Sequence, residues 1–304
     1  MKKVFFLFLM ALCSIGVSAK KKVVYVEYFS YSSEIGDVRT EQVRNSVISA
    51  LAFYQHLQVV DVASQSSLAK EKDRRSDEDA LEDETARIGK MKKLGANYLV
   101  QGYVSTLDIT PKVERNKKGE EKITYNAVMS YSIKVVDCEN GTLMSTDMFT
   151  YDCKNCKNEE ECVQKMLKKT TKSINEVVTK DFKLNSIVLD SDYESKKDIS
   201  KKDILVKCFI NIGEDDGVVP GTVFAVNKAI IKVGRVSWVE VGEIVVENVV
   251  AGDLSLCKVK KGAAEIQTAL EEIISIKETD PNNAHDLIVE SKSFPTKILS
   301  KGLF

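Results

Sequence analysis

Residues 123–136 (ITYNAVMSYSIKVV) alternate apolar and polar side chains along the whole segment. A period of two is typical of a strand with one buried and one exposed face. Asn140 and Gly141 follow, and this dipeptide is a strong signal for a tight hairpin turn. Residues 142–151 are then expected to return as the partner strand. The sequence therefore predicts a long hairpin, which any fold of this chain must accommodate.

Shorter patterns on both sides of this hairpin predict a sheet with helices. Residues 23–29 (VVYVEYF) and 57–62 favour strands, and residues 38–56 carry apolar side chains at helical spacing. A helix that ends at Gly95 precedes a strand over residues 97–107, an order that resembles an α/β crossover unit. Residues 159–182 should form a closing helix. We expect an α/β fold class here, a mixed sheet with flanking helices.

The composition changes at residues 190–202 (DSDYESKKDISKK), which read as a linker. Beyond it, valine-rich runs at residues 204–210, 222–226, 230–240, 243–250 and 254–259 predict a small β-barrel-like domain. The expected domains are a signal peptide (1–19), the α/β domain (20–189), the linker (190–202), the β domain (203–262) and a C-terminal helix and tail (263–304). Residues 71–84 form a dense mixed-charge run, read as a solvated segment.

The N-terminus indicates export from the cytoplasm. Lys2 and Lys3 precede an apolar run over residues 4–17, and a cleavage site is expected after Ala19. Leu12 stands before Cys13, where lipoprotein processing requires a small residue, so lipidation is not expected. No later segment is long enough to span a membrane. We expect an exported, periplasmic protein. Any association with the outer membrane is expected to be peripheral.

Composition excludes several function classes. The formal net charge is −1, which offers no electrostatic footprint for nucleic acid. The chain has two histidines, His56 and His285, and neither has a cluster of cysteines or carboxylates beside it. It lacks HExxH, GxSxG, Walker and GxGxxG motifs. Trp238 lies in a valine-rich strand and is expected in the core or in a subunit contact. We expect no enzymatic activity, no catalytic residues, no cofactor and no metal.

The stretch YDCKNCKNEEEC (residues 151–162) leaves three alternatives open. A zinc site needs four ligands, and the stretch supplies three cysteines without a histidine. A redox dithiol would need an exposed cysteine at a helix N-terminus, but the adjacent acids would raise a thiol pKa. The preferred reading is a local disulfide that joins Cys153 or Cys156 to Cys162 or Cys138. A second bridge between Cys208 and Cys257 is plausible in a closed barrel. The candidate disulfide cysteines are Cys138, Cys153, Cys156, Cys162, Cys208 and Cys257.

Two segments resemble a known family. Residues 88–107 (IGKMKKLGANYLVQGYVSTL) and 134–147 (KVVDCENGTLMSTD) are similar to the periplasmic domain shared by CsgG and the LpoB-like lipoprotein activators of penicillin-binding proteins. Residues 213–226 and 241–259 resemble the small β domain of flagellar-assembly periplasmic proteins. The resemblance implies a CsgG-like fold and a role in envelope assembly rather than an activity.

The sequence also departs from the curli channels of that family, which insert two amphipathic hairpins into the outer membrane. Neither residues 111–122 nor the cysteine stretch has the apolar face that a membrane hairpin needs. The expected function is therefore a non-enzymatic envelope scaffold or adaptor that binds protein partners, with homo-oligomers possible. The alternatives are a subunit of a curli-type secretion channel and, more weakly, an envelope thiol oxidoreductase.

Overall fold

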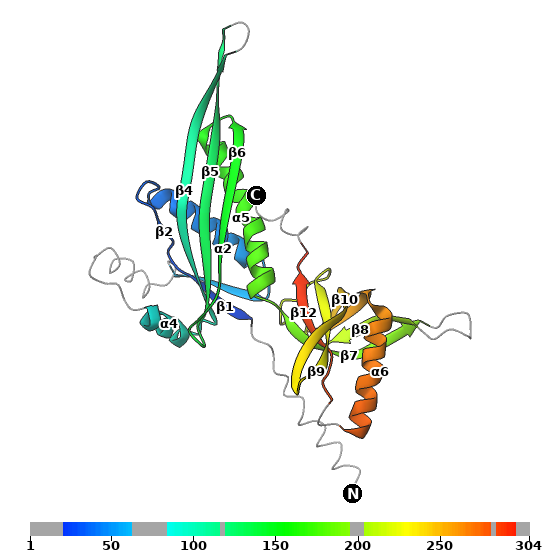
Figure 1. Cartoon of the computed structure of the whole chain (residues 1–304). Helices are drawn as coiled ribbons and strands as arrows, with labels where there is room; N and C mark the ends of the chain where they lie inside the picture. Colours follow the sequence, from blue (N-terminus) through cyan, green and yellow to red (C-terminus); the bar gives the residue numbers. More distant parts are fainter. Residues whose placement is uncertain (1–20, 63–83, 116–118, 195–203, 281–283, 296–304) are drawn as a thin grey trace.

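A computed structural model describes residues 21–62, 84–115, 119–194, 204–280 and 284–295. The predicted signal peptide and the charged run at residues 71–83 lie outside these ranges. Within them, the chain forms a six-stranded mixed sheet and a closed six-stranded barrel, which lie side by side (Figure 1). None of the helices in this part of the chain has the length and apolarity that a bilayer crossing requires.

The mixed sheet has the order β3-β1-β4-β5-β6, and the short β2 pairs with β4. Strands β1 and β3 run parallel, as do β1 and β4, whereas β4, β5 and β6 form an antiparallel meander. The hairpin of β4 and β5 extends beyond the helices (Figure 1). The strands are β1 (Lys22–Val26), β2 (Ser30–Tyr31), β3 (Leu57–Asp61), β4 (Tyr98–Arg115), β5 (Glu121–Asp137) and β6 (Thr142–Cys156).

Helices cover both faces of this sheet. Helices α2 (Asp37–Ala52) and α5 (Glu159–Asp181) pack over one face and bury an apolar core that includes Val104, Tyr131 and Phe149. A smaller core, with Met91 from α4 (Glu84–Lys93), lies on the other face. The mixed sheet thus has one large and one small apolar layer.

The second sheet closes in the order β10-β11-β8-β7-β12-β9, and every pairing in it is antiparallel. Helix α6 (Ala263–Thr279) packs on β8 and β10 through Ile266, Ala269 and Ile273. The barrel strands are β7 (Asn185–Glu194), β8 (Ile204–Ile210), β9 (Val223–Lys232), β10 (Arg235–Ala251), β11 (Leu254–Lys261) and β12 (Ile288–Ser293).

The predicted fold class is wrong. About 50% of the described residues are in strands and 28% in helices, so this is a mixed sheet plus a second, antiparallel sheet, without a clear CsgG-like α/β arrangement. The physical reason lies in the middle of the chain: three long strands follow one another as hairpins, with no helix between β4 and β6. Antiparallel strands need only a tight turn, whereas parallel strands need a crossover.

The barrel also takes strands from segments predicted to lie outside it. Strand β7 begins inside the predicted first domain and runs into the predicted linker, and β12 comes from the predicted tail. Both are needed to close the barrel, because β12 pairs with β7 on one side and with β9 on the other.

The sheet and the barrel contact each other through a small aromatic junction. The buried ring of His56 stacks on Phe294 with a centroid distance of 4.7 Å, and Tyr54 meets Phe294 edge to face. Gly217 of the barrel lies so close that an added Cβ would come within 2.2 Å of the His56 backbone nitrogen. A side chain at that position would therefore push the two units apart.

Candidate functional site

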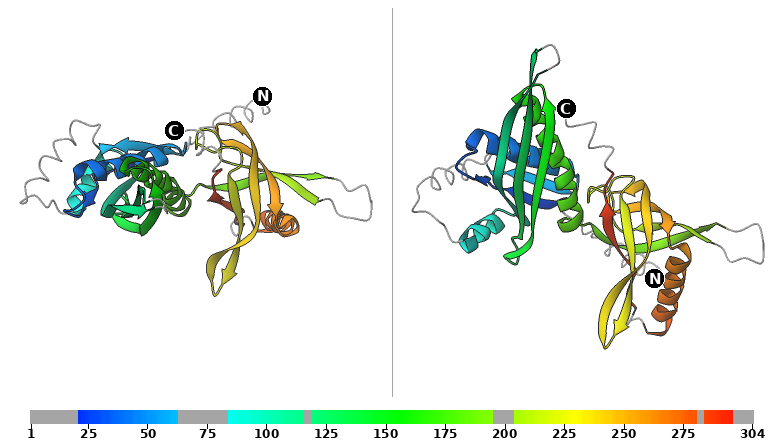
Figure 2. Two further views of the ribbon diagram at one scale, coloured as in Figure 1. Left: turned by 90° about the horizontal axis from the view of Figure 1, so that it is seen from above. Right: turned by 45° about the horizontal axis from the view of Figure 1, so that its top comes forward.

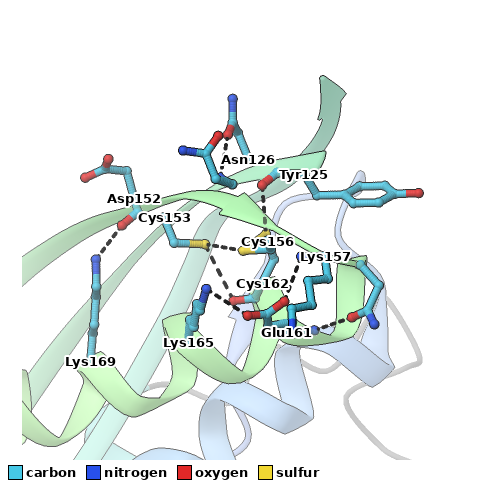
Figure 3. The surroundings of a disulfide bond; sticks show 12 residues. Tyr125, Asn126, Asp152, Cys153, Cys156, Lys157, Glu161, Cys162, Lys165 and Lys169 are labelled. Carbon is cyan, nitrogen blue, oxygen red and sulfur yellow. Dashed lines mark hydrogen bonds and ion pairs between the residues drawn. A yellow bond between two sulfur atoms is a disulfide. The ribbon is translucent and has the colours of Figure 1, made fainter. Parts of the chain in front are cut away.

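Three of the predicted cysteines converge where β6 ends and α5 begins. Cys156 and Cys162 form a disulfide with a Cα–Cα distance of 5.5 Å. The Cys153 sulfur lies 3.5 Å from the Cys156 sulfur and 3.8 Å from the Cys162 carbonyl oxygen (Figure 3). We call Cys153, Cys156 and Cys162 the cysteine cluster.

A β-bulge explains why two cysteines on one strand point the same way. Residues three apart on a regular strand face opposite sides of the sheet. Here Cys153 pairs with Ala127 and Cys156 with Tyr125, so β6 carries one more residue than β5 over this stretch. Asn155 takes a left-handed conformation with φ 59°, and its backbone nitrogen donates to the Asn126 side chain. The extra residue turns both sulfurs toward α5.

The start of α5 is fixed by reciprocal capping. The Asn158 side chain accepts a hydrogen bond from the Glu161 nitrogen at 2.8 Å, and the Glu161 carboxylate accepts one from the Lys157 nitrogen at 2.7 Å. This is close to a capping box. The hydrogen bond from Lys157 and the nearby Lys165 hold the pKa of Glu161 below its usual value. Capping thus places Cys162 in the first turn, opposite the bulge.

The disulfide ties the end of β6 to the helix packed on it. Closing so short a loop stabilises the folded state by about 2 kcal/mol in the chain-entropy model. All three sulfurs lie within 4.8 Å of one another, a spacing that three metal ligands could have. While Cys156 and Cys162 are paired, however, Cys153 is the cluster's one free thiol. In this state the cluster consists of a structural disulfide between β6 and α5 and one adjacent free thiol.

Cys138 does not join the cluster. It follows β5 at the end far from Tyr125, about 40 Å away along the strand, and is buried in the smaller core. Burial raises the pKa of its thiol to about 11. The structure therefore does not bring Cys138 close to Cys153 or Cys156, and the alternative that paired it with one of them is wrong.

Cys208 and Cys257 meet inside the barrel. They are direct cross-strand neighbours on β8 and β11, and both are fully buried. Both are free thiols. Burial raises the pKa of Cys208 to about 12, and burial together with the neighbouring Cys208 raises that of Cys257 further. The two cysteines predicted to pair are therefore neighbours, but the structure has no disulfide between them.

A polar cleft of about 1070 Å³ lies beside the sheet, next to the start of β1. Acidic and basic side chains line it together, so no single charge selects a ligand. Its lining includes Lys21, Lys22, Asp137, Glu139, Glu214 and Asp215.

Sequence reasoning missed two features of this chain. His56, dismissed as a catalytic candidate, is a buried contact between the sheet and the barrel. Burial and the positive charge of Lys22 lower its pKa to about 4. Trp238 is not in the core, because it is 44% exposed on β10, where its ring lies edge to face with His285; the alternative of a subunit contact stays a prediction. No local signal marks either role, because both depend on contacts between distant segments.

Solved structures similar to this chain cover about half of it. They include the LpoB C-terminal domain from Escherichia coli (17% identity, 48% of this chain and 92% of that chain, TM-score 0.30). Lipoprotein GNA1162 from Neisseria meningitidis matches at 11% identity (51% and 99%, TM-score 0.34), and the PelC dodecamer from Paraburkholderia phytofirmans at 12% (52% and 85%, TM-score 0.31). TM-scores below 0.5 assign neither a family nor a function. No protein-family model and no curated protein matches the chain.

Proposed function

We propose that the mature chain is an exported, non-enzymatic adaptor of the cell envelope that binds a protein partner along β6. The observation that carries this proposal is the free edge of β6 with its exposed apolar side chains. Among the described residues β6 pairs only with β5, so its other edge has no strand partner. Leu143, Met144 and Met148 are exposed on this strand.

The exposed side chains continue across the sheet from this edge. Met148 pairs with Ser132, which pairs with Tyr103, and Met148 and Tyr103 are both exposed. The neighbouring row, Val104, Tyr131 and Phe149, is buried under α2 and α5, so the exposed row lies on the opposite face. Methionine and tyrosine are enriched in protein interfaces. A free edge beside such a row can add a strand from a partner.

Helix α5 holds β6 in place. Ser145 donates to the Asp181 carboxylate at 2.5 Å, and Tyr151 and Ser173 share a hydrogen bond of 2.6 Å. Lys180 pairs with Asp147 at 2.8 Å. The disulfide fixes the far end of the strand. A strand already ordered in this way loses less conformational entropy on binding.

Affinity capture from envelope extracts tests the proposal. We expect proteins retained by the wild-type mature chain to be lost with the double variant Leu143→Glu, Met148→Glu. Binding of the partner along β6 would bury the two introduced carboxylates at the interface, which is unfavourable. Val38→Glu on α2 is the control, since Val38 is as exposed as Met148. Equal retention by the double variant and the wild type would refute binding along β6.

A second candidate is a subunit of a curli-type secretion channel, favoured by the projecting β4–β5 hairpin (Figure 1). The hairpin carries the ion pairs Lys112–Glu114 and Arg115–Glu121, which are costly in lipid. Size-exclusion chromatography separates the candidates. The adaptor proposal expects a monomer or small oligomer in detergent-free buffer, whereas a large, detergent-dependent ring would support the channel.

A further inference from the structure

The hairpin of β9 and β10 protrudes from the barrel (Figure 2). Lys232 pairs with Arg235, so Val233 and Gly234 form a two-residue turn at its end. Val233 is fully exposed, with 101% of its reference area accessible, and Ile231 is 67% exposed. Ile231 pairs with Val236 and Ala229 with Trp238, so these four residues share one face. We call Ile231, Val233, Val236 and Trp238 the apolar tip.

The turn itself carries strain. Val233 has φ 51° and Gly234 φ 70°, a pair of positive values typical of a type I′ turn. Asparagine is the favoured first residue of this turn, and a β-branched residue there is an outlier. A fully exposed valine therefore lowers the stability of the turn without gaining any contact in the fold. Such an outlier is a reason to look for a function at this place.

The charged residues of the hairpin itself near the tip are all basic. From residue 227 to residue 239 the sequence contains Lys228, Lys232 and Arg235 and no acid. Lys228 pairs with Glu272 of α6. Lys232 and Arg235 are exposed and form no ion pair with any described residue. Two unneutralised cations thus flank the apex.

We propose that the apolar tip inserts into the surface of an anionic lipid bilayer. Val233 and Ile231 would enter the acyl boundary, and Trp238 would lie at the headgroup level, where its amphipathic ring is favoured. Lys232 and Arg235 pair with each other on the opposite face of the hairpin, where their charged ends would bind lipid phosphates. Convex shape, an aliphatic apex and unpaired cations fit this surface better than the concave pocket of a protein.

The tryptophan makes the proposal directly measurable, because Trp238 is the single tryptophan of the chain. The probe is the chain from Lys20 onward, mixed with vesicles of phosphatidylcholine with or without phosphatidylglycerol. We expect a blue shift of its emission, and co-sedimentation, with the anionic vesicles only, and both should weaken as salt rises. Tryptophan emission that does not change with anionic vesicles would overturn the proposal. A blue shift produced only by a soluble protein partner, and not by vesicles, would overturn it as well.

A substitution at the apex separates lipid binding from folding. Val233→Asn should relieve the turn and raise the melting temperature, yet weaken vesicle partitioning about tenfold, since a buried valine contributes on that scale. Val250→Asn, at an exposed position farther along β10, is the matched control and should leave partitioning unchanged. Undiminished partitioning of Val233→Asn would contradict insertion of the tip. Equal losses in both variants would contradict it as well.

Discussion

Asn155 decides how the cysteines meet, because its left-handed backbone creates the bulge that turns Cys153 and Cys156 toward α5. Asparagine tolerates this conformation better than most residues. The spacing Cys-x-x-Cys on a strand would otherwise place one sulfur on each face. The register of β5 and β6 fixes this outcome, and the quoted stretch of sequence contains no sign of it.

Thiol titration tests the cysteine assignment. Denatured, unreduced mature protein should have four reactive thiols, because two of its six cysteines are paired. In the native state Cys153 alone should react quickly at neutral pH. Burial raises the pKa of Cys138, Cys208 and Cys257, so few thiolates form there. Six reactive thiols in the denatured chain would rule out the disulfide.

The low pKa of buried His56 leads us to expect a lower unfolding free energy in mild acid. Its pKa is about 4 in the folded state against about 6.5 when unfolded, so the unfolded state binds the proton more readily. The contribution of neutral His56 to the unfolding free energy is therefore present above pH 6.5 and is lost as the pH drops toward 4. Urea unfolding should show a loss of about 2 kcal/mol between pH 7 and pH 5 from this residue.

The variant His56→Phe is the matched comparison, since it keeps a ring against Phe294 and cannot titrate. It should show a flatter dependence of unfolding free energy on pH in this range. The same slope in the variant and the wild type would assign the acid sensitivity to other groups.

At the scale of elements, a fully buried arginine ties α2 to the sheet. Arg44 donates to the backbone oxygens of Glu27 and Val26 and forms ion pairs with Glu41 and Asp61. Arg44→Ala should lower the unfolding free energy by about 3 kcal/mol, because it leaves buried acceptors without a donor. Chemical denaturation measures this loss.

Arg39→Ala on the same helix serves as control. Arg39 makes a long, partly exposed ion pair with Glu159 at 3.8 Å, so its loss should cost less than about 1 kcal/mol. Similar losses for the two variants would show that the buried network around Arg44 does not stabilise the fold as described.

Local patterns predicted individual elements better than their pairing. The alternation at residues 123–136 and the turn at Gly141, which has φ 67°, correspond to β5 and its hairpin with β6. The barrel closure depends instead on β12, whose residues 288–290 pair with residues 185–187 about a hundred positions earlier. Such pairings follow from packing of the whole chain, so neighbouring residues carry no signal for them.

At the scale of the whole molecule, the sheet and the barrel present separate exposed surfaces. The β6 edge belongs to the sheet, and the apolar tip belongs to the barrel. The aromatic junction of Tyr54, His56 and Phe294 connects the two units. A protein built in this way could hold a protein partner with one unit and a lipid surface with the other.

Photo-crosslinking in the intact cell envelope tests partner binding along β6 most directly. A photoreactive amino acid is placed at Met148 or, in a parallel strain, at Val38, which are 76% and 75% exposed. Binding along β6 predicts protein adducts at Met148 in several-fold excess over Val38. Equal yields at the two positions, or no protein adduct at Met148, would contradict it.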